Sequence, residues 1–284
     1  MHGHPSAPPA SARRQLRGLG LRPRRGLSQS FLEDERTAAA IVRAAELQPG
    51  QDDVLEVGPG LGALTRRLVR LARRVVAVEL DSNLADWLRS ALVDVPNLSV
   101  QTADILQVEP ARFFDLPFVV VANLPYHITS PALRHLLAAG PPGPARLIVM
   151  VQAEVGQRIG APPGQLSALG VSVQAQARVR VVRHVPSTAF YPRPKVDSVV
   201  LRLEPLADAE RPVARTDVAE FVRLVQAGFR QPRKTLANSL ADGLGIPKAE
   251  AQALLERAGL DPSRRPQQLS VADWAALFRT RRAP

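Results

Sequence analysis

The sequence of 284 residues contains no cysteine, which excludes disulfide bonds and thiolate metal sites. Only five histidines are present, and no two of them have the spacing of a helical zinc motif. No apolar run approaches the roughly 20 residues that span a bilayer, so we expect no membrane association. The lack of cysteine is compatible with a reducing compartment, and we expect a cytoplasmic protein.

Acidic residues are absent from the start of the chain, where the first one is Glu33. Six arginines lie between residues 13 and 25, in a stretch rich in proline, glycine, alanine and serine. We therefore expect residues 1–25 to be a basic, disordered arm. The arm lacks the apolar core of a secretory signal peptide, although an arginine-rich transit peptide is an alternative. The net charge of +11 favours a polyanionic partner, nucleic acid first and an anionic membrane surface second.

Short apolar strands alternate with helices through the first half of the chain. Strands are expected at 53–57, 74–80, 98–102, 117–122 and 146–152, and helices at 63–72, 81–93 and 130–139. We expect Asp81 and Ser130 to cap two of these helices, with Pro131 at the first helical position after Ser130. The alternation predicts an α/β fold with a parallel sheet covered on both faces.

The pattern changes twice in the second half of the chain. Segments 171–185 and 196–203 are β-rich and predict an antiparallel hairpin at one sheet edge. Four helical segments follow, at 217–230, 233–240, 248–258 and 271–282. We therefore expect three parts: the arm at 1–25, an α/β domain at 26–205 and a small all-helical domain at 206–284.

A glycine-rich loop joins the first expected strand to the first helix, with Gly58 and Gly60 in it. Glycines there let the backbone approach a ligand, and the helix N-terminus adds partial positive charge. Glu79 ends the second strand and suits the two hydroxyls of a ribose, while Asp104 follows the third and suits an adenine amino group. Both acids also fit purely structural roles: Glu79 as the exposed end of a strand and Asp104 as a helix cap or turn residue. The loop satisfies G-x-G-x-x-A, so a nicotinamide-dependent dehydrogenase and an S-adenosylmethionine-dependent methyltransferase both fit these features.

The fourth strand leads into Asn123, Leu124, Pro125 and Tyr126. Asn supplies a side-chain carbonyl, the Leu-Pro backbone supplies fixed carbonyls, and Tyr supplies an aromatic face. These groups suit the exocyclic amine of a nucleobase, although a strand ending in a proline turn is the plainer interpretation. The loop, the two acids and this motif stand at the ends of four strands, so one crevice can collect them all. The amine motif favours the methyltransferase.

Six segments in the same order resemble the motifs of the ribosomal RNA adenine N6,N6-dimethyltransferase family of the KsgA type. They are residues 26–32, 56–65, 123–126, 151–155, 190–198 and 229–240. The resemblance covers roughly 26–284 and implies a Rossmann-like class I S-adenosylmethionine-dependent methyltransferase with a small helical RNA-binding domain. The chain departs from the family pattern at Ser30, where the family has Asn, at Pro232, and at Leu166-Ser167.

The resemblance implies dimethylation of the N6 amines of two adjacent adenines in a hairpin near the 3′ end of small-subunit (16S) rRNA. The enzyme would act in ribosome biogenesis, on rRNA within a ribosomal particle, and as a monomer. The residues carried over to S-adenosylmethionine are Gln29, Leu32, Gly58, Gly60, Glu79, Asp104 and Asn123. Those expected at the adenine are Asn123, Leu124, Pro125, Tyr126 and Phe190, although an aromatic beside a proline-rich loop also fits simple packing.

Clustered cations give candidate contacts to RNA phosphates, which supply salt-dependent affinity rather than sequence choice. They are Arg193 and Lys195 beside the expected pocket, and Arg230, Arg233 and Lys234 at the start of a helix. A solvated charged face is the plainer interpretation of both clusters.

Three other functions stay open on the sequence alone. A large-subunit rRNA adenine methyltransferase of the resistance type is disfavoured by segment 233–240 and by the helical C-terminal region. A non-catalytic assembly or transcription factor on a methyltransferase scaffold is disfavoured by Glu79, Asp104 and the 123–126 motif. A dehydrogenase is disfavoured because no proton-relay constellation is evident.

Overall fold

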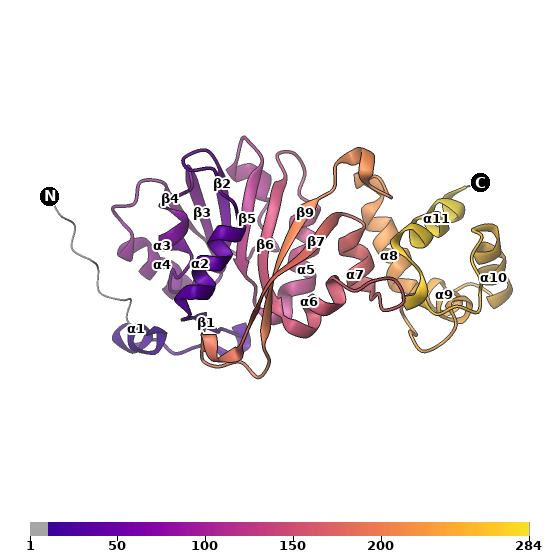
Figure 1. Cartoon of the computed structure of the whole chain (residues 1–284), viewed down its shortest axis with the longest axis horizontal. Helices are drawn as coiled ribbons and strands as arrows, with labels where there is room; N and C mark the ends of the chain where they lie inside the picture. Colours follow the sequence, from indigo (N-terminus) through magenta and orange to yellow (C-terminus); the bar gives the residue numbers. More distant parts are fainter. Residues whose placement is uncertain (1–10, 284) are drawn as a thin grey trace.

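A seven-stranded sheet forms the centre of the computed structural model, which describes residues 11–283 (Figure 1). The strand order is β4-β3-β2-β5-β6-β9-β7. Neighbouring strands are parallel from β4 to β6, and β9 pairs antiparallel with both β6 and β7. The strands are β2 (Asp53–Val57), β3 (Arg74–Glu79), β4 (Leu98–Thr102), β5 (Phe118–Asn123), β6 (Pro144–Gln152), β7 (Ala177–Val185) and β9 (Ser198–Pro205). The structure confirms the five parallel strands and the antiparallel hairpin at the edge. The register and the neighbours of each strand come from the structure alone.

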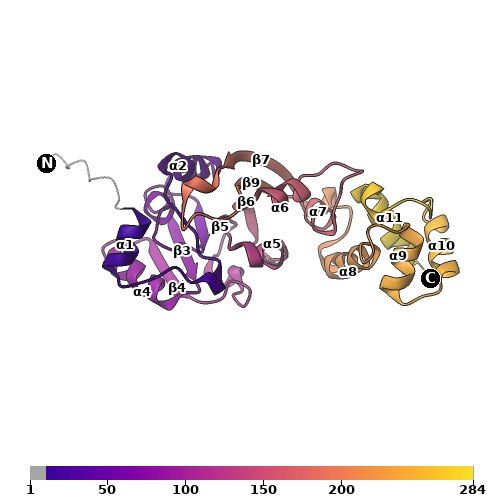
Figure 2. The same ribbon diagram turned by 90° about the horizontal axis from the view of Figure 1, so that it is seen from below.

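Apolar layers cover both faces of the sheet, so β2 and β5 are buried on both sides. Along β5, Val120 and Ala122 face one core cluster, whereas Val119 and Val121 face the other. The first cluster includes side chains of α5 (Thr129–Leu137), and the second includes side chains of α2 (Glu35–Ala44). Figure 2 shows these two helices on opposite sides of the sheet.

The strand order reverses beside β2, which has β3 on one side and β5 on the other. Connections therefore leave the carboxyl ends of β2 and β5 in different directions, which opens a crevice at that point. The remaining elements around the sheet are α3 (Thr65–Leu68), α4 (Ser82–Ala91), α6 (Ala153–Ile159), α7 (Ala168–Gln174) and a small second sheet of β1 (Phe31–Leu32) with β8 (Phe190–Tyr191).

The expected helix boundaries hold in one case and fail in two. Asp81 caps α4 through a hydrogen bond to the backbone N–H of Asn83, as expected. The helix expected at 63–72 is reduced to the single turn α3. The prediction that Ser130 caps α5 is wrong, because a 3₁₀ turn at Tyr126–Ile128 runs directly into the helix and leaves Ser130 inside it.

The first part of the segment expected as a strand at 171–185 is helical. Ser167 accepts a hydrogen bond from the backbone N–H of Gly170 and caps α7, which extends through Gln174. Val171 on this helix packs into the core of the C-terminal helices. Tertiary packing and a cap therefore override the preference of valine for strands.

The prediction of a disordered arm is wrong for residues 12–18. They form α1 (Ala12–Gly18), whose Ala12 and Leu16 are buried against Phe31, Leu61 and Leu84. Burial of this apolar stripe stabilises the short helix. Residues 1–10 of the expected arm lie outside the described residues.

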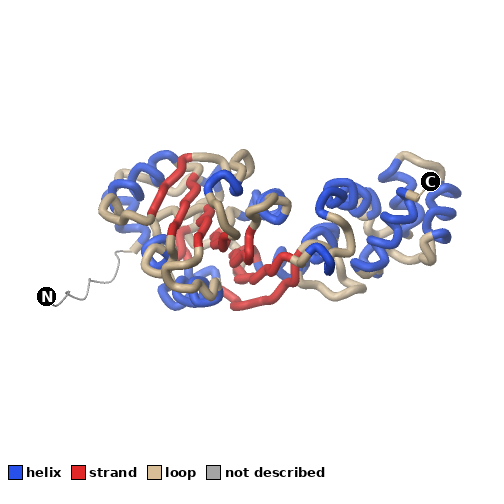
Figure 3. Tube along the Cα trace, turned by 90° about the horizontal axis from the view of Figure 1, so that it is seen from above, coloured by secondary structure: helices blue, strands red, loops and turns tan. Residues whose placement is uncertain are grey.

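The last part of the described chain is helical, as Figure 3 shows by its lack of strands there. Its helices are α8 (Val218–Gly228), α9 (Leu236–Leu244), α10 (Lys248–Arg257) and α11 (Val271–Arg282). They enclose a separate core around Trp274, which Leu166 and Val171 from the preceding part also enter. The expected boundary at 205/206 thus lies where strands give way to helices, but residues from both sides of it contribute to the core around Trp274. The division into domains stays a prediction.

No helix within residues 11–283 has the length and apolar character that crossing a bilayer requires.

Candidate active site

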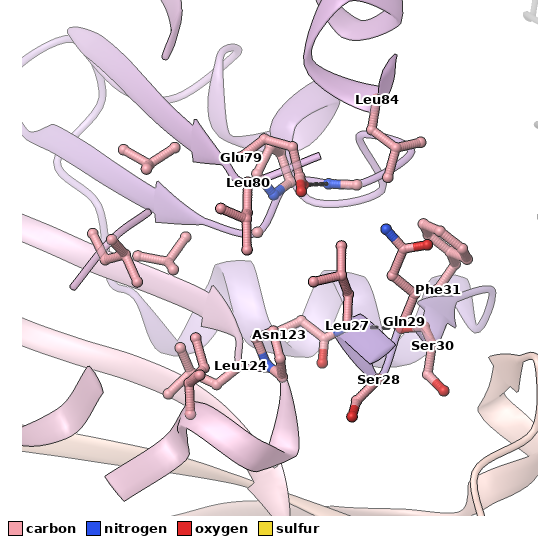
Figure 4. Close-up of a pocket in the computed structure, with 18 of the residues that line it drawn as sticks. Leu27, Ser28, Gln29, Ser30, Phe31, Glu79, Leu80, Leu84, Asn123 and Leu124 are labelled. Atoms are coloured by element: carbon pink, nitrogen blue, oxygen red, sulfur yellow. Dashed lines mark hydrogen bonds between the residues drawn. The ribbon is translucent and has the colours of Figure 1, made fainter. Parts of the chain in front are cut away.

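One cavity lies at the carboxyl ends of the parallel strands and gathers the four features that the sequence placed there (Figure 4). Ten predicted residues line it: Gln29, Leu32, Gly58, Gly60, Glu79, Asp104, Asn123, Leu124, Pro125 and Tyr126. The parallel register of β2, β3 and β5 brings residues far apart in the sequence to this edge. The predicted single crevice is therefore present.

The glycine loop closes one side of the cavity. Gly60 adopts a φ of +54°, which favours glycine, and a Cβ there would lie 3.1 Å from Cδ1 of Phe31. Gly58, with a φ of +70°, donates its N–H to the carbonyl of Val78 at 2.9 Å and so ties the loop to β3. A larger side chain at Gly60 would displace the Phe31 ring.

Glu79 is held in place by two backbone N–H groups. Its Oε2 accepts from Gly60 and its Oε1 accepts from Asp81, each at 3.0 Å. Burial raises the pKa of Glu79, and the two N–H donors oppose that shift in part. Each oxygen keeps acceptor capacity. A fixed pair of acceptors at the end of β3 suits two neighbouring hydroxyls.

Asp104 combines a turn role with a place in the cavity wall. Its Oδ1 accepts the backbone N–H of Leu106 at 2.9 Å, which fixes the loop after β4. The side chain is half-buried beside the apolar Ala103 and Ile105, which also line the cavity. A flat apolar group with an amino substituent would find both a surface and an acceptor here.

Asn123 is oriented by a contact with the segment that precedes β1. Its Nδ2 donates to the backbone carbonyl of Ser30 at 3.2 Å. This leaves Oδ1 as an acceptor, and among the described residues no donor is bonded to it. Leu124 is buried and donates its N–H to Met150 at 3.2 Å, which fixes the peptide that follows Asn123.

Tyr126 lines the cavity, and a hydrogen bond at its hydroxyl fixes the position of its ring. Its hydroxyl hydrogen-bonds Ser198 Oγ at 2.8 Å. Burial raises the pKa of the phenol, so Tyr126 is neutral at neutral pH. The ring offers a face for stacking rather than a charge.

The structure does not bring Phe190 to this cavity. Its side chain is 4% exposed and packs in the core beside Leu32, with which β8 pairs it across the small second sheet. In this structure Phe190 packs in the core, as the packing alternative expects, and its contact with the target adenine stays a prediction.

Residues 27–32 line one side of the cavity, and we call this segment the strap; Figure 4 labels its residues from Leu27 to Phe31. Gln29 donates through Nε2 to Asp81 at 3.0 Å and accepts the N–H of Arg24 at 2.8 Å. Ser30, where the family has Asn, donates its hydroxyl to the carbonyl of Pro192 at 3.0 Å. Ser30 thus joins the strap to the loop after β8.

Glu56 is a cavity-lining residue that the sequence reasoning did not select. It is 1% exposed, and its Oε2 has no hydrogen-bond partner among the described residues. Burial, with a smaller contribution from Glu79, raises its pKa to about 8, while the adjacent Thr65 opposes the shift. The signal available in the sequence was a carboxylate inside an otherwise apolar strand.

The expected RNA contacts fall in two places. Arg193 and Lys195 are exposed on the loop between β8 and β9, where Arg193 Nε donates to Ser187 Oγ at 3.0 Å. Arg233 and Lys234 are exposed in the turn between α8 and α9, not at a helix start, because α9 begins only at Leu236. Arg230 in the same region forms an ion pair with Asp242 at 2.9 Å.

The cavity fits a donor that carries an adenosine. Acceptors stand at the ends of β3 and β4, the walls are largely apolar, and the glycine loop leaves room between them. In addition, Glu56 supplies an unpartnered buried oxygen in the wall. These features suit an adenosine held at the ends of β3 and β4.

A parallel sheet with a glycine loop after one strand, acids after the next two and a single cavity between them defines a class I methyltransferase fold. Residues 20–281 match the family model described as "Ribosomal RNA adenine dimethylase". The chain therefore belongs to the ribosomal RNA adenine dimethylase family.

Curated relatives and solved structures agree with this assignment. "Ribosomal RNA small subunit methyltransferase A" of Dehalococcoides mccartyi strain 195 is 42% identical over 94% of this chain and 91% of the relative. The protein of the same name from Moorella thermoacetica is 43% identical over 93% and 94%. A dimethyladenosine transferase from Plasmodium falciparum superposes with a TM-score of 0.72, at 26% identity over 87% of this chain and 95% of that one. The 23S rRNA methyltransferase ErmE superposes with a TM-score of 0.67, at 32% identity over 88% and 98%.

Proposed function

We propose that this chain dimethylates the N6 amines of two adjacent adenines in a hairpin near the 3′ end of small-subunit rRNA, with S-adenosylmethionine as the methyl donor. The observation that carries the proposal is the cavity in which Asn123 and Tyr126 adjoin Glu79 and Asp104. The names of the curated relatives support the small subunit.

The donor would lie along the crevice and supply a methyl group from its sulfonium. Glu79 would accept the ribose hydroxyls, and Asp104 the adenine amino group, each through oxygen that the backbone N–H bonds leave available. Gln29, Leu32, Gly58 and Gly60 would surround the remainder. The strap would exclude water from one side of the donor.

The target adenine must leave its stack to reach the cavity. Tyr126 would stack on the base, and the Asn123 Oδ1 and the Leu124 carbonyl would accept the two N6 hydrogens. Their acceptance localises the nitrogen lone pair, which is otherwise delocalised into the ring, and directs it toward the methyl group. The hydrogen bond from Asn123 to Ser30 supports this role, because it turns the acceptor oxygen away from the strap.

No side chain is needed as a general base. Once methylated, the nitrogen carries a positive charge and an acidic proton, which it loses to water. One N6 hydrogen remains for the second transfer, so one of the two acceptors then faces the first methyl group. The pocket must therefore tolerate a methyl beside either Asn123 or Leu124.

The likeness to ErmE favours one second candidate, a methyltransferase of large-subunit rRNA. Its structure aligns with 88% of this chain, so the shared fold does not separate the two substrates. The greater identity to the small-subunit relatives favours the first candidate.

In the test, the full chain is incubated with S-adenosylmethionine labelled in its methyl group. The substrates are unmethylated small and large ribosomal subunits. Label on small-subunit RNA supports the proposal, and label on large-subunit RNA supports the second candidate. A Glu79→Gln variant serves as the matched control. It keeps the size of the side chain but has one acceptor oxygen fewer, so we expect weaker donor binding and less label. Absence of label with the wild-type protein on either subunit would contradict both candidates.

We extend the proposal to a ribosomal particle as the substrate, a monomeric enzyme and a cytoplasmic site of action. Naked rRNA as a control in the same assay tests the first point, and sedimentation of the free protein tests the second. Microscopy of the tagged protein in its cell of origin tests the third.

A further inference from the structure

The helix α1 precedes residue 20, where the match to the family model begins. It is nevertheless fixed to the catalytic part of the molecule. The backbone N–H of Ala12 donates to Glu33 Oε1 at 2.6 Å, and Leu16 is 3% exposed. Figures 1 and 2 both place α1 beside the sheet, at the opposite end of the molecule from the C-terminal helices.

The helix packs directly behind the cavity wall. Its buried side chains contact Phe31, Leu61 and Leu84, and these three residues also line the cavity. Between α1 and the strap, Arg24 forms an ion pair with Asp81 at 3.3 Å, and Gln29 bonds the same carboxylate. The helix is therefore held at its first residue and along its buried face, and the segment that follows it is tied to Asp81.

The outer face of α1 is a row of cations. At 100° per residue, Arg13, Arg14 and Arg17 fall within one arc of about 100°, away from the buried stripe of Ala12 and Leu16. All three arginines are exposed, as is Arg22 in the segment that follows. Within the part of the chain that the structure describes, none of the four forms an ion pair.

No acidic residue precedes Glu33, and its carboxylate already accepts the N–H of Ala12. Among the described residues, none of these four arginines forms an ion pair with Glu33 or with any other carboxylate. Guanidinium groups on a docked helix lose less conformational freedom on binding phosphate than the same groups on a flexible arm, and their planar donors match phosphate oxygens.

We propose that Arg13, Arg14, Arg17 and Arg22 form a phosphate-binding surface that holds the RNA backbone beside the cavity. The surface fits consecutive phosphates of an RNA strand that flanks the flipped base. It acts with the cations of the C-terminal turn at the other end of the molecule, so the RNA is held on both sides of the site. The identity of that RNA as ribosomal rests on the proposed function.

The test compares the full-length wild type with a triple variant, Arg13→Gln, Arg14→Gln and Arg17→Gln. Gln keeps a good helix former at each position and removes the charge. The probe is a fluorescent RNA hairpin with two adjacent adenines in its loop, titrated without methyl donor over a range of KCl concentrations. Each neutralised phosphate contributes about 0.7 to 0.9 to the slope of log K against log salt, so three lost contacts reduce the slope by about 2 to 3.

A matched control removes the same net charge from arginines that already have carboxylate partners. It carries Arg112→Gln, Arg158→Gln and Arg178→Gln, whose partners are Glu109, Glu154 and Glu210. We expect a much smaller change in slope. A second triple variant, Arg13→Lys, Arg14→Lys and Arg17→Lys, keeps the charge, and we expect it to keep the wild-type slope.

Two results would overturn the inference: a slope in the α1 variant equal to that of the wild type, or a reduction no greater than that of the control. Donor affinity, measured by calorimetry, is expected to stay unchanged, and a loss of donor binding would instead assign α1 a purely structural role. Because the binding assay contains no donor, its outcome is separate from that of the methyl-transfer assay. An active wild type with an unchanged slope contradicts this inference alone, and an inactive wild type contradicts the proposed function.

Discussion

Asn123 donates its side-chain amide to the backbone carbonyl of Ser30, 93 residues earlier in the chain, at 3.2 Å. The bond connects the end of β5 to the strap that lines the cavity, and it fixes which atom of the amide faces the site. Ser30 in turn donates its hydroxyl to Pro192. Ser30, which departs from the family pattern, therefore makes two contacts. Its backbone carbonyl orients Asn123, and its hydroxyl binds the loop after β8.

Replacement of Asn123 by Ala is expected to reduce methyl transfer by about 10²-fold or more, because it removes a preorganised acceptor for the N6 amine. Circular dichroism and the melting temperature should stay close to those of the wild type, since Asn123 is only partly buried. The exposed Asn83, changed to Ala, is the surface control. Turnover at the wild-type rate by the Asn123 variant would rule out the role assigned to this residue.

For Tyr126, the structure predicts different results for two substitutions. Tyr126→Ala removes the stacking face, worth about 1–3 kcal/mol per base, and should reduce turnover by about 5- to 150-fold. Tyr126→Phe keeps the ring and loses only the bond to Ser198, so its effect should be smaller and should match that of Ser198→Ala. Single-turnover rates measure this, and equal losses for Ala and Phe would assign the function to the hydroxyl.

Glu56 makes stability depend on pH. Its pKa is about 8 in the folded protein and near the ordinary 4.5 when unfolded, so between these values the unfolded state binds fewer protons. The free energy of unfolding contributed by this site therefore falls as pH rises from about 4.5 to 8. Glu56→Gln cannot ionise, and its advantage over the wild type should grow across that window.

Urea denaturation of both proteins at pH 5, 6.5 and 8 checks this. The pKa of Glu79 is also raised, but Glu79 is present in both proteins, so the difference between them reports Glu56 together with its coupling to Glu79. A difference in unfolding free energy that is constant with pH would mean that Glu56 is ionised throughout.

Leu16→Ala tests the docking of α1. The side chain is buried against cavity-lining residues, so its truncation should weaken docking by about 2 kcal/mol or more. Trypsin should then cleave faster at the arginines of residues 13–24, and donor binding should weaken. Leu116→Ala, at a side chain that is 51% exposed, is the control. Cleavage of the Leu16 variant at the wild-type rate would contradict a docked helix.

The sequence predicted the parallel strands and most of the cavity because those elements carry local signals. Val119 and its neighbours form a continuous apolar run, Glu79 ends a strand, and Gly58 and Asp104 each follow one. Strand ends in a parallel sheet meet at one edge, so the order of elements was sufficient to bring these residues together.

The remaining features depend on contacts between distant segments. Leu16 stabilises α1 through contacts that include Phe31, Leu61 and Leu84, none of which lies within its own helix. Phe190 turns into the core because β8 pairs with β1, and a motif match contains no such pairing. Burial of Glu56 likewise requires the packed sheet, so its raised pKa has no counterpart in the sequence pattern.

The central claim is that this cavity holds adenine by its N6 amine and methylates it twice. The most direct measurement digests small-subunit RNA to nucleosides after reaction and identifies the product by mass spectrometry, with the position mapped on the intact strand. We expect N6,N6-dimethyladenosine at two adjacent positions in a hairpin near the 3′ end. Methylation at another base or ring position, or confined to large-subunit RNA, would contradict it.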